Sequence, residues 1–239
     1  LSNLAMIRSD LGEYDDAERL YREALAGMQA SLGEQHPEVA IVMGNLGRLL
    51  QSRGDHGGAR ALFDDALRIR LAVFGESHPV TAENLNDIGF LLSESGDAKE
   101  AEQFYLRALD AYPPDHKGRG ATVFNLGRLA ENRGEYTIAE RRYREALALQ
   151  RKDYGEAHDR VGADLNRLGI VLHRQGRLDE AEASMRQALA IYRERMPAGH
   201  QSLAAVLVPL GELLIARKRH TDAEPLVRAA LVFSVLTSL

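Results

Sequence analysis

The sequence predicts an all-α fold, a solenoid of about six antiparallel helix pairs. Three observations support this prediction. A turn glycine recurs at intervals of 42, 42, 38 and 42 residues, at Gly12, Gly54, Gly96, Gly134 and Gly176, and Lys218 takes the sixth place. Apolar residues recur in the same register, with helical rather than alternating spacing. A unit of this length cannot bury its apolar face alone, so neighbouring units must stack.

The repeat divides the chain into six units, residues 1–36, 37–78, 79–116, 117–158, 159–200 and 201–239. We interpret them as a single solenoid. Residue 1 falls inside a first helix whose opening turn is missing, so we also interpret the chain as a fragment of a longer protein.

The second unit shows how each helix pair is defined. Its first helix is predicted from Pro37 to Ser52 and ends before Gly54, because glycine readily adopts the left-handed conformation that terminates a helix. Its second helix is predicted from Gly57 to Phe74. This helix contains apolar residues at the i, i+4, i+7, i+8 spacing of an amphipathic helix, namely Ala59, Phe63, Ala66 and Leu67.

Each first helix carries a small residue and each second helix a large one at a fixed position. The small residues are Ala5, Gly47, Gly89, Gly127, Gly169 and Gly211, and the large ones are Tyr21, Phe63, Tyr105, Tyr143, Met185 and Val227. Small residues let two helices approach closely, and a large residue fills the space beside them. We therefore interpret these positions as packing residues.

The third unit is four residues short. Its second helix should end at or before Tyr112, because Pro113 and Pro114 cannot continue a helix. The connector that follows, residues 115–120, contains two glycines. We expect a change in superhelical pitch there, with a hinge between units one to three and units four to six.

Together these residues resemble tetratricopeptide repeats, and more closely the long repeats of kinesin light chains. The matching residues of the second unit are Asn45, Leu46, Gly47, Leu50, Gly54, Asp55, Ala59, Leu62, Phe63, Ala66, Leu67 and the connector 74–79. The resemblance covers nearly the whole chain and implies a right-handed superhelix whose first helices line a concave groove. The chain departs from the family pattern in its lack of tryptophan, its short third unit and Lys218.

The resemblance places polar residues of the first helices in that groove. They are Asn3, Asn45, Arg48, Gln51, Asn86, Phe90, Asn125, Arg128, Asn132, Asn166, Arg167, His173 and Arg174, together with Met6, Asp87 and Glu131. An asparagine amide donates to a peptide carbonyl and accepts from a peptide N–H, so a row of asparagines can hold an extended backbone. Arginines fit carboxylates, and kinesin light chain grooves hold acidic peptides, so we expect an acidic segment as the ligand.

Two alternatives stay open at this point. The asparagines could instead bond neighbouring helices, because buried amides must find partners. Arg48 and Arg128 could be ordinary surface residues in salt bridges.

Composition argues against several function classes. The chain has no cysteine, so it has no disulfide and no thiolate nucleophile. Its net charge is −5 and its basic residues are spread along every unit, which makes nucleic acid a poor partner. The apolar stretch 229–239 is too short to span a membrane. No nucleophile and base recur together, so we expect neither an enzyme nor a cofactor. We expect a cytoplasmic protein, of the kind in which such arrays accompany kinase or protease domains in bacterial signalling.

Five histidines recur in the connectors, at His36, His78, His116, His158 and His200. A metal ladder is one interpretation, but stacked units would hold these side chains too far apart for one ion. We favour helix starts, because proline follows His36 and His78 at the first helical position, where its missing N–H costs nothing. No metal site is expected.

The last unit ends in an apolar stretch. Val232, Phe233, Val235 and Leu236 lie where earlier units carry arginine and glutamate, although a terminal unit normally needs a polar outer face. We expect this stretch to contact a second copy, which would form a homodimer, or another covering element. The sequence therefore predicts a protein-interaction module that binds an extended, acidic peptide in its groove. The alternative is a self-associating scaffold of a larger signalling protein.

Overall fold

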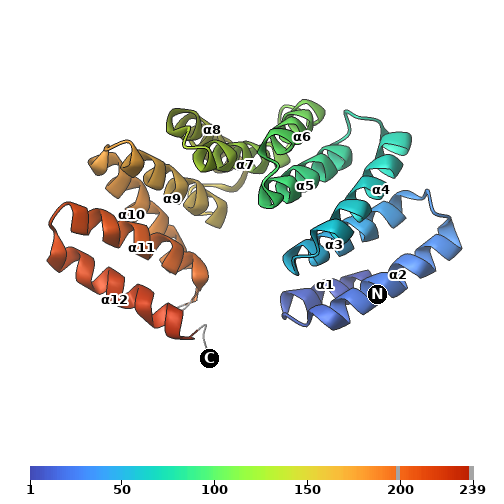
Figure 1. Ribbon diagram of the computed structural model, residues 1–239, viewed down its shortest axis with the longest axis horizontal. Helices are drawn as coiled ribbons and strands as arrows, with labels where there is room; N and C mark the ends of the chain where they lie inside the picture. Colours follow the sequence, from blue (N-terminus) through green and yellow to red (C-terminus); the bar gives the residue numbers. More distant parts are fainter. Residues whose placement is uncertain (198–199, 237–239) are drawn as a thin grey trace. The chain divides into compact units, whose positions relative to one another are not determined.

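The computed structural model describes residues 1–197 and 200–236, the last five of them by backbone alone. These residues form twelve helices and no strand, which confirms the predicted all-α class. The first helices are α1 (Ser2–Asp10), α3 (Pro37–Ser52), α5 (Pro79–Ser95), α7 (Gly118–Asn132), α9 (Asp159–Arg174) and α11 (Gln201–Ala216). The second helices are α2 (Tyr14–Leu32), α4 (His56–Phe74), α6 (Ala98–Ala111), α8 (Tyr136–Tyr154), α10 (Leu178–Arg195) and α12 (His220–Leu236). One antiparallel pair falls in each predicted unit of the repeat (Figure 1).

The helices group into two compact bodies, Leu1–Thr122 and Val123–Leu239, and the boundary lies within α7. We call them the N-terminal body and the C-terminal body. In both, the two helices of a pair pack together, as α3 does with α4 and α9 with α10. Each body has a buried apolar core between its helices. The interpretation of the whole chain as one solenoid stays a prediction.

A residue in the left-handed conformation lies in each turn within a helix pair. Gly54 has a φ of 82°, which glycine adopts without a steric penalty. In the sixth pair Lys218 has a φ of 59°. The turn geometry is therefore kept where the glycine is lost, at a cost of about 1 kcal/mol for a residue with a side chain.

The connector histidines cap the first helices that follow them. The Nδ1 atoms of His36, His78, His116, His158 and His200 accept a hydrogen bond from the backbone N–H two residues later, at 3.1–3.3 Å. The first amides of a helix have no intrahelical partner, so a side-chain acceptor stabilises the helix start. This confirms the helix-start interpretation. Across the described residues, no group of three or more histidine or acidic side chains could hold a metal ion.

The recurring small residue lies against the recurring large one. A Cβ added to Gly127 on α7 would lie 2.7 Å from a ring carbon of Tyr143, which is fully buried on α8. The same close approach occurs at Gly47, Gly89, Gly169 and Gly211. These positions are packing residues, as predicted, because there is room for a hydrogen atom but not for a methyl group.

The short second helix of the third pair is α6. It has 14 residues, against 19 in α4 and α8, and its C-cap is Tyr112. The predicted end of this helix is therefore confirmed, and Pro113 follows the cap directly. The predicted change of pitch beyond it stays a prediction.

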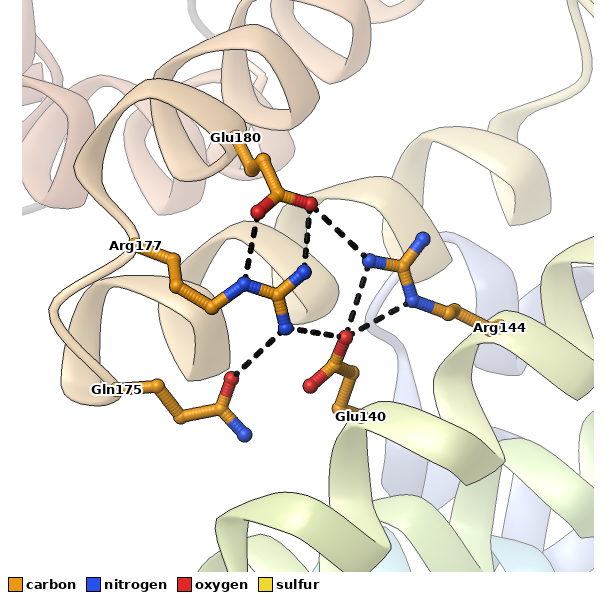
Figure 2. A network of polar contacts seen from close by, with 5 residues as sticks. All are labelled: Glu140, Arg144, Gln175, Arg177 and Glu180. Carbon is orange, nitrogen blue, oxygen red and sulfur yellow. Dashed lines mark hydrogen bonds and ion pairs between the residues drawn. The ribbon is translucent and has the colours of Figure 1, made fainter.

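Ion pairs join consecutive helix pairs of the C-terminal body. Arg177, in the turn between α9 and α10, lies 2.7 Å from Glu140 on α8 and 2.6 Å from Glu180 on α10. Arg144 lies 3.0 Å from Glu140 and 3.5 Å from Glu180. Figure 2 shows the result, an acid and a base from each pair closed into a ring, with Gln175 attached. We call this arrangement the charge ring.

Glu140 of the charge ring has equivalents in other helix pairs. Glu182 on α10 lies 3.0 Å from Arg217 and 2.8 Å from Arg219, both in the next turn. In the N-terminal body, Glu18 on α2 lies 2.7 Å from Arg53. A glutamate on one second helix thus repeatedly receives an arginine from the turn that follows in the stack.

Candidate functional site

Four of the predicted groove residues of the N-terminal body, Arg48, Gln51, Asp87 and Phe90, meet in a pocket between α3 and α5. Its volume is about 490 Å³. The pocket is lined by Arg48, Gln51, Ser52, Gly54, His56, Asp87, Phe90 and Glu94. The two first helices contact one another, so residues on the exposed sides of both reach the same space. We call it the α3–α5 pocket.

The charged groups of the α3–α5 pocket are bonded to one another. Arg48 donates to Asp87 at 2.6 Å and to the side-chain oxygen of Asn45 at 2.7 Å. Gln51 donates to Glu94 at 2.6 Å. The pocket therefore holds one arginine, which is already paired, and two carboxylates. This favours the salt-bridge interpretation of Arg48, and nothing in this pocket selects an acidic ligand.

Arg48 has a second role as the partner of a confined carboxyl group. Burial raises the pKa of Asp87, and the positive charges of Arg48 and Arg70 oppose the rise. Burial also lowers the pKa of Arg70, whose guanidinium donates to the Val80 carbonyl at 2.8 Å. A charge that loses its partner in such surroundings is strongly destabilising. Replacing Arg48 would therefore destabilise the α3–α5 pocket itself as well as change its affinity for a ligand.

Two of the predicted asparagines form hydrogen bonds to the neighbouring first helix. The Asn86 side-chain oxygen on α5 accepts from the Thr122 hydroxyl on α7 at 3.0 Å. The Asn166 amide on α9 donates to the Ala205 carbonyl on α11 at 3.1 Å, and Asn166 is buried. Both asparagines occupy the same position of the repeat. At this position the helix-bonding alternative is favoured.

Glu131 is the central carboxylate on the first helices of the C-terminal body. It accepts from the Tyr143 hydroxyl at 2.5 Å, and its other oxygen lies 3.5 Å from Arg167. Burial raises the pKa of Tyr143, and the negative charge of Glu131 acts in the same direction, so this hydroxyl stays a donor. The positive charges of Arg167 and Arg128 also act on Tyr143. Arg167 thus lies beside a carboxylate that is already engaged, and Arg128 precedes Glu131 by three positions on α7.

The remaining predicted residues lie on the first helices with different degrees of exposure. Asn3, Asn132 and Arg174 are exposed, and Asn125 and His173 are half-buried. Within the described ranges Arg174 forms no ion pair. The part of α7 and α9 in the C-terminal body carries Arg128, Arg167 and Arg174 together with the carboxylates Glu131, Asp159 and Asp164, and the adjacent α11 adds Glu212.

Sequence reasoning missed Glu94. This residue follows Asp87 by seven positions and Phe90 by four, so all three lie on one side of α5. That spacing was visible in the sequence. His56, at the start of α4, was also missed, and its ring nitrogen lies 3.1 Å from the Ser95 hydroxyl at the end of α5.

The predicted C-terminal contact residues lie outside the described side chains. They are Val232, Phe233, Val235 and Leu236, so their expected role stays a prediction. Among the described helices, none is both long and apolar enough to cross a membrane.

Comparison with known proteins identifies the class of repeat. The family model described as tetratricopeptide repeat matches residues 1–72, 50–113 and 120–194, which is most of the chain. The fold and this match define a helical repeat protein of the kind that mediates protein–protein interaction. The chain belongs to the tetratricopeptide repeat family. No curated protein sequence matches it.

Solved structures show the same fold. BtubC (BKLC) from P. vanneervenii is 20% identical with a TM-score of 0.77, over 95% of this chain and 92% of that one. TPR-like repeats of a Podosopora anserina protein assigned as a kinesin light chain are 20% identical with a TM-score of 0.67, over 84% and 98%. A chain of the APC/C hetero-tetramer Cut9-Hcn1 is 15% identical with a TM-score of 0.75, over 97% and 39%. The similarity to kinesin light chain repeats confirms the resemblance inferred from the sequence.

Proposed function

We propose that the exposed sides of the first helices bind an extended segment of a partner protein. The observation that carries the proposal is the α3–α5 pocket, where four residues placed in the groove by sequence register, Arg48, Gln51, Asp87 and Phe90, line one space. An aromatic side chain among hydrogen-bonding groups is typical of a protein recognition surface. The protein therefore acts as a non-enzymatic interaction module.

The C-terminal body selects acidic side chains in this proposal. Arg128, Arg167 and Arg174 lie on α7 and α9, and Glu131, which lies 3.5 Å from Arg167, is bonded to Tyr143. A guanidinium binds a carboxylate through two parallel hydrogen bonds, which adds geometric selectivity to the charge. The α3–α5 pocket, with two carboxylates, instead contributes apolar and hydrogen-bonding contacts.

Charge reversal tests the selection of acidic side chains. The probe is a labelled peptide of glutamate and aspartate around one tyrosine, and its affinity is measured by fluorescence anisotropy at low salt. Replacing Arg128 and Arg174 by glutamate should weaken binding by about 1–3 kcal/mol, because charge-assisted hydrogen bonds are lost.

The matched control is Arg141→Glu. Arg141 is exposed on α8 in the same body, so this variant reverses one arginine charge, as each of the two test substitutions does, but away from the proposed surface. It should bind the peptide as the wild type does. Unchanged affinity in the Arg128 and Arg174 variant, or an equal loss in the control, would show that these arginines do not select the ligand.

A second candidate function is a self-associating scaffold. One observation favours it: two apolar side chains of the sixth helix pair, Ile215 and Leu231, are 47% and 61% exposed.

A further inference from the structure

One carboxylate of the α3–α5 pocket has no basic partner. Arg48 lies 2.6 Å from Asp87, whereas Glu94 accepts a hydrogen bond from the neutral amide of Gln51. Among the described residues, no basic side chain forms an ion pair with Glu94. Two carboxylates therefore face the single guanidinium of this pocket, and one negative charge is left without a positive one.

An aromatic residue lies one helical turn from this carboxylate. Phe90 precedes Glu94 by four positions on α5, so the two side chains lie on the same side of the helix. Both line the α3–α5 pocket. Phe90 is half-buried and Glu94 is exposed. The pocket thus combines a phenylalanine with an acceptor that carries a full negative charge.

The N-terminal body already binds arginines with this combination of groups. On α6, Glu100 and Phe104 are also four positions apart, and Arg60 of α4 lies 3.3 Å from the carboxylate and 5.5 Å from the centre of the ring. Arg107 lies 5.4 Å from the centre of the same ring and 2.9 Å from Glu76. A guanidinium is attracted by the face of the ring, and the carboxylate adds charge-assisted hydrogen bonds. Twice, therefore, a phenylalanine and a glutamate in this body hold an arginine.

The repeat itself does not require an acid at the position of Glu94. The equivalent residues of the other first helices are Asp10, Ser52, Asn132, Arg174 and Ala216. Helix packing is thus compatible with a neutral, a basic or an apolar side chain at this position. The glutamate of α5 is available for a ligand.

We propose that the α3–α5 pocket binds an arginine side chain of the partner segment, with the guanidinium on Glu94 and against Phe90. This inference rests on the proposed function and adds the identity of one side chain of the partner. The volume of about 490 Å³ is typical of a ligand pocket. Arginine fits better than lysine, because its planar group stacks on a ring and binds a carboxylate through two hydrogen bonds at once. The partner segment then carries a basic residue for this pocket as well as acidic residues for the C-terminal body.

Disulfide tethering tests the choice of side chain. Ser52 lines the pocket, its hydroxyl bonds only to the Leu49 carbonyl of its own helix, and the chain has no cysteine, so Ser52→Cys places a single thiol there. The probes are the cysteamine amides of N-acetylarginine and of N-acetylcitrulline, which is a neutral analogue of arginine with nearly the same shape. Each is equilibrated with the protein and 2-mercaptoethanol, and mass spectrometry measures the fraction of protein in the mixed disulfide. Both probes carry the same thiol, so their difference reports the side chain alone.

The equilibrium constant for the arginine probe should exceed that for the citrulline probe at least about threefold, because only the arginine is charged. Adding Glu94→Gln should bring the ratio close to one, although the glutamine oxygen can still accept from Gln51. The matched control is Glu38→Gln, which removes one exposed carboxylate from the other end of α3 and should leave the ratio unchanged. Circular dichroism verifies that each variant is folded.

Equal equilibrium constants for the two probes, or a preference for arginine that survives Glu94→Gln, overturn the proposal. An equal loss in the Glu38→Gln control also overturns it, because the preference would then reflect the overall charge of the protein. No peptide takes part in this equilibrium. A failure of the peptide assay would therefore contradict the proposed function alone, and a failure of the tethering assay would contradict this inference alone.

Discussion

At the scale of single residues, Asp164 is a buried carboxyl group at a position where α5 carries an asparagine. It is fully buried on α9, and neither carboxyl oxygen has a hydrogen-bond partner. At the equivalent position of α5, the Asn84 amide donates to the Phe63 carbonyl at 3.1 Å. An ionised carboxylate cannot donate such a bond, whereas a protonated one can. Burial raises the pKa of Asp164 to about 8, against the opposing charges of Arg160 and Arg151.

Asp164 should make the stability of the C-terminal body depend on pH. In the unfolded chain its pKa is about 4, so above that pH the unfolded state loses a proton that the folded state keeps. The free energy of unfolding should therefore fall as the pH rises from about 4, and level off above about 8. Tyr192, also buried, has a pKa raised by burial to about 12, with the charges of Asp159 and Asp164 contributing, and it stays neutral in this range.

Asp164→Asn tests this assignment. The amide is neutral at every pH and can donate as Asn84 does, so the variant should be more stable than the wild type above neutral pH by about 1–3 kcal/mol. Chemical denaturation from pH 5 to pH 9 should show the difference growing with pH. A variant less stable at high pH, or a constant difference across the series, would contradict a buried protonated Asp164.

At the scale of helices, the contact between α7 and α8 depends on the absence of a methyl group. Gly127→Ala would place a Cβ 2.7 Å from the buried ring of Tyr143. The helices must separate or the ring must leave its rotamer, so we expect a loss of about 1–3 kcal/mol in the free energy of unfolding. Thermal and chemical denaturation measure the loss.

Gly27→Ala is the matched control for this prediction. Gly27 lies inside α2 with no neighbouring atom within 4 Å of an added Cβ. The same substitution should therefore stabilise the protein by about 0.5–1 kcal/mol, through helix propensity alone. If both glycines respond alike, propensity and not close packing governs the Gly127 position.

At the scale of the whole molecule, the short α6 should allow the predicted hinge between units one to three and units four to six. The helix ends before Tyr112 and two prolines, which removes about a turn that α4 and α8 possess. Restoring four residues to α6 and replacing Pro113 and Pro114 should narrow the distribution of distances between units one to three and units four to six. Because the chain has no cysteine, spin labels on cysteines introduced at Glu23 and Glu194 report that distance without further changes. Equal distributions in both proteins would exclude a hinge at this connector.

The repeat, the helix bounds and the packing positions could be predicted from the sequence because they depend on neighbours within about a turn or two of the chain. The periodic leucines and alanines define the buried sides. The connector histidines, two of them followed by proline, define helix starts, and Gly54 or Lys218 define the turns. The small residue and the large one recur in register, so even the contact between Gly127 and Tyr143 was predictable as packing.

Only the tertiary structure decided which polar side chains are engaged. Arg48 meets Asp87 across 39 positions of sequence, and Asn166 meets the carbonyl of Ala205 across the same distance. Such partners depend on how one helix pair stacks on the next, and local sequence does not encode that geometry. For this reason the sequence by itself determined a tetratricopeptide-like array and the sides of its helices. The structure showed that Asn86 and Asn166 bond neighbouring helices and that Arg48 is engaged in an ion pair.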